Sequence, residues 1–171
     1  MAHPGYNSRA MIDKTVRDDL RFMKAAVREA ARAADRGEVP VGAVVVRDGK
    51  ILARGSNRPV RTSDPTAHAE IVALRRACRR AGNYRLPDCD LYVTVEPCAM
   101  CLGAVVQARV RRLVYGASDP KAGAVRSIMT FPFSRTNHRP EILGGLLGED
   151  CGRLIRDFFR RKRRARPGPK A

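Results

Sequence analysis

The sequence predicts an α/β protein in which a mixed sheet is covered by helices on both faces. Segments with helical spacing alternate along the chain with short apolar runs, and an Asp-Gly dipeptide joins two of these runs as an antiparallel hairpin. Two later runs are separated by a helix, so we expect them to be parallel. At 171 residues and 44% apolar composition, the chain suits one domain with a substantial core.

The first half of the chain carries clear signals for its elements. Apolar residues recur at helical spacing over residues 16–36, and Gly37 can close that helix. Strands follow at 41–46 and 50–55, on either side of Asp48-Gly49. The next helix contains the stretch PTAHAEIVALRRA, with Asp64 or Thr66 placed to cap it and Gly82 placed to end it.

The second half begins as regularly and then becomes harder to interpret. We expect a buried strand at 90–96, a helix at 98–109 and a strand at 111–116. Residues 117–148 are rich in Gly, Pro and small polar residues, so we predict mostly loop there, with a short strand at 141–143. A last helix starts near Glu149.

We expect one domain spanning residues 17–163. Residues 1–16 form a flexible amino-terminal extension in this prediction, and residues 164–171 form a basic, disordered tail. The last twelve residues, RRKRRARPGPKA, hold seven basic residues, no acid and two prolines. Such a run can bind phosphates or can serve solubility alone. Phe158 and Phe159, just before it, offer an apolar anchor and a stacking face for a loop base.

Charge indicates the kind of partner. Lys and Arg total 34 against 17 acidic residues, a net charge of +17, which favours a polyanion such as nucleic acid. A genome-wide bias toward arginine is the alternative cause. There is no apolar run long enough to span a bilayer and no apolar signal core near the start, so we expect a cytoplasmic protein without membrane contact.

The cysteines point to chemistry. Five cysteines in a chain without a secretion signal favour free thiols or metal ligands over disulfides. Cys98 and Cys101, in VEPCAMC, share the first turn of a predicted helix, where two thiolates can bind one metal. His68, at the start of another helix, is the natural third ligand. A closed zinc site and a redox pair remain alternatives for a lone Cys-x-x-Cys motif.

Glu70 lies two residues beyond His68 and gives the proposed metal site a catalytic character. Three protein ligands leave a fourth zinc position open for water, and a carboxylate beside it can carry a proton. The alternative for Glu70 is a solvated glutamate that favours the helix dipole.

The pattern HAE followed by PCAMC is the known signature of zinc nucleobase deaminases. Over about residues 20–163 the sequence resembles the bacterial tRNA-specific adenosine deaminases, which convert the wobble adenosine of an arginine tRNA to inosine. The matching stretches are EVPVGAVVV, SNRPVRTSDPTAHAEIVAL, LYVTVEPCAMCLGA, ASDPKAG, TNHRPEIL and DFFRRKR.

The resemblance implies the cytidine-deaminase-like fold, a three-layer αβα sandwich with a mixed five-stranded sheet, and a homodimer that binds a tRNA anticodon stem-loop. It implies that His68, Cys98 and Cys101 bind one zinc ion per chain and that Glu70 moves protons in a hydrolytic deamination. Asn57 is then the expected partner of the flipped purine. Further expected RNA contacts are Asp119, Lys121, Asn137 and His138.

Two other functions share parts of this pattern. Deaminases of free guanine, cytosine or cytidine have the same signature but need no large basic surface. A non-catalytic RNA-binding subunit would keep zinc and replace the proton-carrying glutamate, whereas Glu70 is present here.

Overall fold

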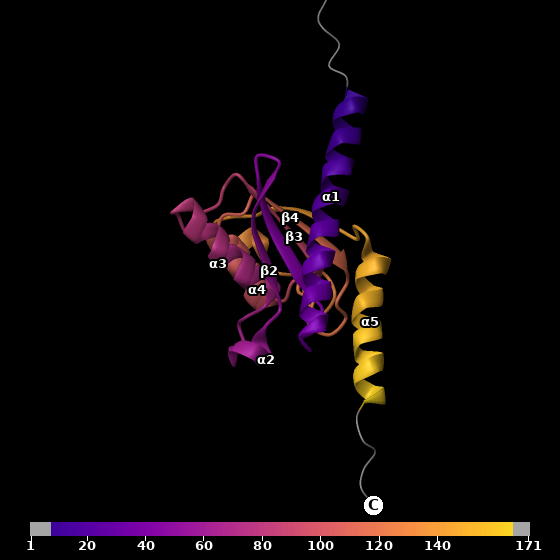
Figure 1. The fold of residues 1–171 in the computed structure, drawn as a ribbon. Helices are drawn as coiled ribbons and strands as arrows, with labels where there is room; N and C mark the ends of the chain where they lie inside the picture. Colours follow the sequence, from indigo (N-terminus) through magenta and orange to yellow (C-terminus); the bar gives the residue numbers. More distant parts are fainter. Residues whose placement is uncertain (1–7, 166–171) are drawn as a thin grey trace, which may run out of the picture.

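The computed structural model describes residues 8–165, which form a single layered unit (Figure 1). In chain order the elements are α1 Ser8–Asp35, β1 Gly42–Arg47, β2 Lys50–Ser56, α2 Pro59–Thr62, α3 Ala69–Ala81, β3 Cys89–Val95, α4 Ala99–Gln107, β4 Arg112–Ala117, a 3-10 turn Phe133–Arg135, β5 Glu141–Gly144 and α5 Gly148–Arg164.

The five strands form one mixed sheet in the order β2-β1-β3-β4-β5. β1 pairs antiparallel with β2 and β3, whereas β3, β4 and β5 run parallel. Asp48 and Gly49 both have positive φ, of 50° and 68°, which is the backbone of a tight two-residue hairpin. The predicted hairpin and the predicted parallel pairing across a helix are both confirmed.

Side chains from the central strand β3 alternate between two helical layers. Leu91 and Val93 belong to the core cluster formed with α3 and α4, and Tyr92 belongs to the cluster formed with α1 and α5. This confirms the predicted three-layer αβα sandwich with a mixed five-stranded sheet. None of the helices within residues 8–165 combines the length and the apolar composition that a membrane crossing requires.

Several boundaries differ from those predicted. α1 begins at Ser8 rather than at residue 16, so helix already occupies residues 8–16 of the expected extension. α5 continues through Arg164, the first residue of the predicted tail. Residues 1–7 and 166–171 lie outside the described residues, so the expected flexibility of both ends stays a prediction. The short helix α2 was not predicted, and the carboxylate of the buried Glu38 accepts hydrogen bonds from two of its backbone N–H groups.

The start of α3 also differs from the prediction. The helix begins at Ala69, with His68 as the preceding cap residue and without a bond from a cap side chain. Asp64 instead accepts hydrogen bonds from the backbone and hydroxyl of Thr66 in the turn before the helix. The first helical N–H, that of Ala69, donates to the side-chain oxygen of Asn57 at 2.9 Å. A residue twelve positions away therefore does what a local cap was expected to do.

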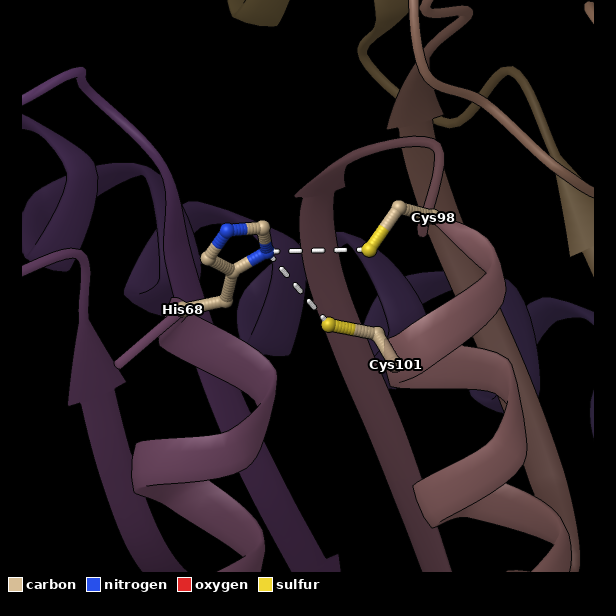
Figure 2. A group of neighbouring side chains, drawn as sticks. All are labelled: His68, Cys98 and Cys101. Atoms are coloured by element: carbon tan, nitrogen blue, oxygen red, sulfur yellow. Dashed lines mark hydrogen bonds between the residues drawn. The ribbon is translucent and has the colours of Figure 1, made fainter. Parts of the chain in front are cut away.

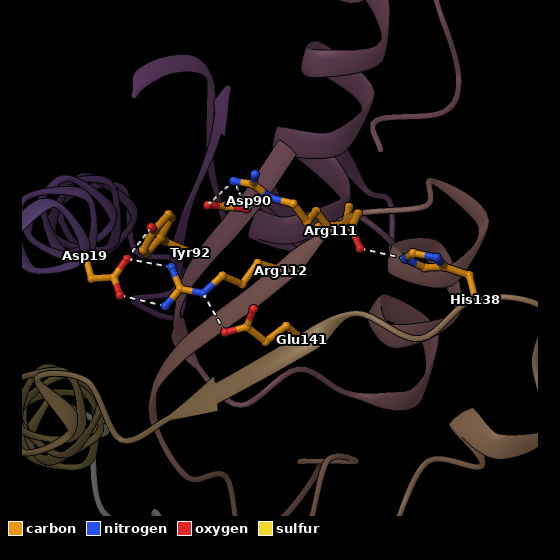
Figure 3. Close-up of polar contacts among 8 residues, drawn as sticks. Asp19, Asp90, Tyr92, Arg111, Arg112, His138 and Glu141 are labelled. Atoms are coloured by element: carbon orange, nitrogen blue, oxygen red, sulfur yellow. Dashed lines mark hydrogen bonds and ion pairs between the residues drawn. The ribbon is translucent and has the colours of Figure 1, made fainter. Parts of the chain in front are cut away.

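A buried polar network ties α1 to the sheet (Figure 3). Arg112 on β4 donates two hydrogen bonds to Asp19 on α1, at 2.8 and 2.7 Å, and the Tyr92 hydroxyl donates to the same carboxylate at 2.6 Å. Burial raises the pKa of Tyr92, and the hydrogen bond to Asp19 raises it further. Arg112 also pairs with Glu141 on β5. The network therefore joins α1 with β3, β4 and β5 at the end of the sheet where β3 and β4 begin.

Gly55 on β2 fixes the position of α3. A Cβ atom at this position would lie 2.2 Å from the Ala69 carbonyl oxygen and 2.6 Å from the Ala73 nitrogen, both in the α3 backbone. Gly55→Ala should therefore lower the free energy of unfolding by about 1–3 kcal/mol, because the backbone atoms of α3, unlike a flexible side chain, cannot move away from the added Cβ atom. Chemical denaturation measures this loss.

Gly103→Ala is the matched control for this variant. A Cβ atom at Gly103, inside α4, would have no heavy atom within 4 Å apart from its chain neighbours and the surrounding backbone of α4. That variant should raise the free energy of unfolding by about 0.5–1 kcal/mol, since alanine is the better helix former. Equal stabilities for the two variants would show that close packing of β2 against α3 does not constrain the fold.

Candidate active site

Three potential metal ligands meet at the starts of two helices (Figure 2). His68 immediately precedes α3, Cys98 immediately precedes α4, and Cys101 lies in the first turn of α4. The Nδ1 atom of His68 lies 3.7 Å from the Cys98 sulfur and 3.6 Å from the Cys101 sulfur. All three ligand atoms lie within 4.8 Å of one another. The structure thus brings together the three ligands that the sequence predicts.

The spacing of these atoms fits a tetrahedral zinc ion. Zinc binds thiolate sulfur at about 2.3 Å and imidazole nitrogen at about 2.0–2.1 Å, which places nitrogen and sulfur ligands about 3.6 Å apart. The two nitrogen-to-sulfur distances here, 3.7 and 3.6 Å, match that separation. Two soft thiolates and one imidazole are also a ligand set that suits zinc. Cys98, Cys101 and His68 therefore meet both the geometric and the chemical requirement.

The electrostatics of the cluster favour a bound cation. A hydrogen bond from the Cys101 thiol, together with His68, lowers the pKa of Cys98 to about 4. The Cys101 thiol has a raised pKa, because its proton is held by the Cys98 sulfur and because it is buried. The hydrogen bond with Cys98 raises the pKa of His68. A cation would release the proton shared by the two sulfurs, since metals bind thiolates and not thiols.

Glu70 lies in the first turn of α3 with only 3% of its surface exposed. Burial is the largest influence on its carboxyl group and raises the pKa above the usual value, while Cys101 lies within interaction distance. A buried carboxyl group with a raised pKa, beside a candidate metal site, is suited to taking up and releasing a proton during a reaction. The alternative of a solvated glutamate at the helix start is wrong.

Asn57 joins the cluster through the backbone of α3. Its side-chain oxygen accepts the hydrogen bond from the Ala69 N–H, next to His68. The amide oxygen is therefore engaged, and the amide NH₂ group is the part that can donate to a purine. Asn57 follows β2 directly, so the end of that strand holds the expected base-binding residue at the edge of the metal cluster.

Asp119 and Lys121 lie in the loop after β4, at the same end of the sheet as the metal cluster. The Asp119 carboxylate accepts hydrogen bonds from the backbone N–H groups of Lys121 and Ala122, which closes a tight turn. The Lys121 side chain is exposed. The structure thus places both expected RNA contacts on the side of the molecule that holds the site.

A residue that the sequence analysis missed, Glu96, holds this loop in place. One carboxylate oxygen accepts hydrogen bonds from the N–H groups of Val125, Arg126 and Ser127 at 2.8–3.1 Å. The other oxygen accepts from the Asp119 N–H and from the Ser127 hydroxyl. Burial alone would raise the pKa of Glu96, but these hydrogen bonds lower it. An ionisable residue directly after the buried strand β3 was the available signal.

Asn137 and His138 do not lie near the cluster within this chain. The His138 ring is 2.7 Å from the Val110 carbonyl oxygen, and Arg109 donates to the Asn137 carbonyl oxygen. Both contacts lie just before β4 begins, whereas the cysteines follow the end of the parallel strand β3. The start and the end of β4 lie about 16 Å apart along the strand. Placing these two residues on the RNA side together with the metal cluster is therefore not supported by the fold of one chain.

The two phenylalanines of α5 have different environments. Phe158 is 4% exposed, so its ring is covered and anchors the helix instead of offering a stacking face. Phe159 is 41% exposed and lines a largely apolar cavity of about 450 Å³, together with Lys121 and with Val39 and Val41 from the segment before β1. Of the two, Phe159 alone remains a candidate for stacking on a base.

Comparison with known proteins defines the class. The family model described as MafB19-like deaminase matches residues 17–163. The tRNA-specific adenosine deaminase of Agrobacterium fabrum is 50% identical over 143 residues, covering 83% of this chain and 94% of that protein. The enzyme of the same name from Bacillus subtilis is 45% identical over 148 residues, covering 86% and 91%. The chain therefore belongs to the family of tRNA-specific adenosine deaminases.

Solved structures agree with this assignment. A chain from a study of A-to-I editing by tRNA:A34 deaminases at the wobble position of transfer RNA superposes with a TM-score of 0.76 at 49% identity, covering 78% of this chain and 98% of that one. The guanine deaminase of Nitrosomonas europaea superposes with a TM-score of 0.69 at 26% identity, covering 81% and 83%. The fold is shared more widely than the sequence.

Replacing Glu96 should loosen the loop that carries Asp119 and Lys121. In Glu96→Gln the amide places an NH₂ group against at least one backbone donor, so the loop forms fewer hydrogen bonds to this side chain. We expect the free energy of unfolding to fall by about 1–3 kcal/mol. Hydrogen exchange at the amides of Val125, Arg126 and Ser127 should accelerate, and amides in β1 should be affected less.

Glu149→Gln is the control, because Glu149 is an exposed glutamate on α5. Unchanged exchange at residues 125–127 in Glu96→Gln, relative to this control, would show that the carboxylate does not order the loop.

Proposed function

We propose that this protein is a zinc-dependent enzyme that hydrolyses the wobble adenosine of a tRNA to inosine, with an arginine tRNA as the expected substrate. The observation that carries the proposal is the buried carboxyl group of Glu70 beside three ligands spaced for zinc, in a member of this family. Glu70 also separates the proposal from a non-catalytic zinc subunit, which would not need a proton carrier.

His68, Cys98 and Cys101 would hold the zinc ion through one nitrogen and two sulfur atoms. When bound, zinc polarises a water molecule and brings its pKa toward neutrality. The starts of α3 and α4 fix the ligands, and the hydrogen bond from Ala69 to Asn57 fixes the turn that carries His68.

Glu70 would move the protons of the reaction. Its carboxylate accepts a proton from the attacking water and delivers it to N1 of the purine, while the oxygen bonds to C6. The carboxylate then takes the remaining proton from the C6 hydroxyl group and passes it to the amine on C6, so the C–N bond breaks, ammonia leaves, and the C6 carbonyl of inosine forms. Burial excludes bulk water from Glu70, so the same group can serve both steps.

The target base must be unpaired to reach this site. The ligands lie between two helix starts, where a base within a helical stack cannot enter, whereas an anticodon loop can present a splayed base. Asn57 would donate from its amide NH₂ to the flipped purine. Because the substrate would be a tRNA, we expect the enzyme to act in the cytoplasm.

Cations and an aromatic ring border the route by which RNA would approach. Lys121, Phe159 and three arginines of α5, namely Arg156, Arg160 and Arg163, line a groove of about 520 Å³. Phosphates can meet the cations, and a base can stack on Phe159. We propose that Lys121 and Phe159 contact the anticodon loop, with Asp119 shaping the turn beside them.

We also propose a homodimer. Met100 at the start of α4 and Ile128 and Met129 in the following loop expose 37%, 55% and 44% of their surfaces. Their segments are joined by a hydrogen bond from the Ala124 N–H to the Pro97 carbonyl oxygen. Exposed apolar side chains in neighbouring segments beside the site are suited to a second copy of the chain.

Replacing the proton carrier tests the mechanism. Glu70→Gln keeps the shape of the side chain but cannot carry a proton, so inosine formation on an anticodon stem-loop should fall by about 100- to 10,000-fold. Single-turnover rates measure the effect. Glu141→Gln, at the opposite end of the sheet, is the control and should retain activity. A Glu70→Gln enzyme as fast as that control would contradict the assigned role.

Metal content tests the ligand set. Freshly purified protein should contain about one zinc ion per chain by elemental analysis. Cys98→Ser should lose most of the metal, because one of three ligands is removed. Cys78→Ser is the control, since Cys78 is half-buried in α3 and lies outside the cluster. Active protein without zinc, or equal zinc in the two variants, would exclude the proposed centre.

A further inference from the structure

A second cationic pocket lies on the other side of the site from α5. Its volume is about 300 Å³, and it is bordered by the end of α1, the end of β2, α2 and the first turns of α3. Five arginines line it against two glutamates, Glu29 and Glu38. The arginines are Arg32, Arg36, Arg58, Arg61 and Arg76.

Most of this positive charge is not neutralised. Glu29 pairs with Arg32 at 2.7 Å, and Glu38 accepts from the N–H groups at the start of α2. Within residues 8–165, Arg36, Arg58, Arg61 and Arg76 have no ion pair. Arg76 is held by a hydrogen bond to the Arg54 carbonyl oxygen. The pocket therefore offers several guanidinium groups to an anion.

Arg58 belongs to this pocket through the terminal part of its side chain. Its Nε atom is covered by the protein and has no hydrogen-bond acceptor within the described part of the chain. An anion in the pocket would therefore meet Arg58 through its terminal NH₂ groups, and phosphate oxygens suit such a contact in charge and in geometry.

The pocket lies next to the catalytic centre. Arg58 directly follows Asn57, and Val72, on the pocket wall, is one helical turn beyond His68. In Figure 1, α2 and the adjoining ends of α1 and α3 lie at one end of the molecule, toward which α5 also extends. The sheet order β2-β1-β3-β4-β5 puts this pocket on the β2 side and the α5 groove on the β4 side.

We propose that this arginine pocket binds a backbone phosphate of the substrate RNA on the β2 side of the target nucleotide. The proposal rests on the proposed function and adds an RNA-binding site that the sequence did not indicate. If phosphates of the RNA are bound on both sides of the metal cluster, the nucleotide between those phosphates presents its base to Glu70. Phosphate contacts fix the register of a strand without reading its sequence.

Two exposed arginines allow a direct test. Arg36→Gln/Arg61→Gln should bind an anticodon stem-loop about tenfold more weakly at low salt, and the log-log salt slope should fall by about 0.7–0.9 for each phosphate that is no longer neutralised. The charge-matched control is Arg47→Gln/Arg79→Gln, which removes two exposed arginines at the opposite end of the sheet. That control should keep the affinity and slope of the wild type. Thermal melting confirms that both variants fold.

Neutral phosphate analogues identify the phosphate that the pocket binds. Methylphosphonates placed singly at the loop phosphates should include one position that weakens wild-type binding but not binding by Arg36→Gln/Arg61→Gln. Equal affinity and slope in the variant and the control would overturn the proposal. Weaker binding at an unchanged slope would also overturn it, because removing a cation from a phosphate must change the slope. Inosine formation by the wild type is measured separately, so failure of the proposed function is distinguished from failure of this site.

Discussion

The site depends on the spacing of two helices over the sheet. β2 and β3 run in the same direction because each is antiparallel to β1, which lies between them. Two strand spacings are about 10 Å, which matches the distance at which two helices pack side by side. α3 follows β2 and α4 follows β3, so both helices begin at the same edge and at contact distance. His68 and the two cysteines meet for this reason.

Two buried glutamates near the site are tuned in opposite directions. Glu70 is surrounded by few donors, and burial raises its pKa, which suits a group that exchanges protons. Glu96 has the same small exposed fraction, but its carboxylate lies less deep in the protein, and five hydrogen bonds from one loop outweigh burial and lower its pKa. It remains a fixed negative charge around which the loop is ordered. The depth of burial and the number of donors together decide which way the pKa of each glutamate shifts.

The arginines at the two ends of the sheet include groups with different roles. Where β3 and β4 begin, Arg111 pairs with Asp90 and Arg112 pairs with Asp19, so these arginines stabilise the fold. At the catalytic end, Arg36, Arg58 and Arg61 surround a pocket without forming ion pairs within the described residues. A genome-wide bias toward arginine can explain how many arginines the chain holds, and exposed arginines such as Arg47 and Arg79 also lie at the opposite end of the sheet. The pocket differs from these because five arginines line one cavity beside the metal cluster, an arrangement that suits a phosphate.

The sequence by itself determined the features that depend on neighbouring residues. The Asp48-Gly49 hairpin, the end of α3 at Gly82, and the ligand spacing of Cys98 and Cys101 follow from local backbone and helix geometry. Only the tertiary structure decided how distant segments meet. Asn57 completes the start of α3, Glu96 orders residues 119–127, and His138 lies at the far end of β4. Hydrogen bonds between residues far apart in sequence depend on the path of the chain, so they leave no periodic pattern in the sequence. Loops such as 117–140, which also lack the periodicity of a helix or strand, are therefore the hardest segments to predict.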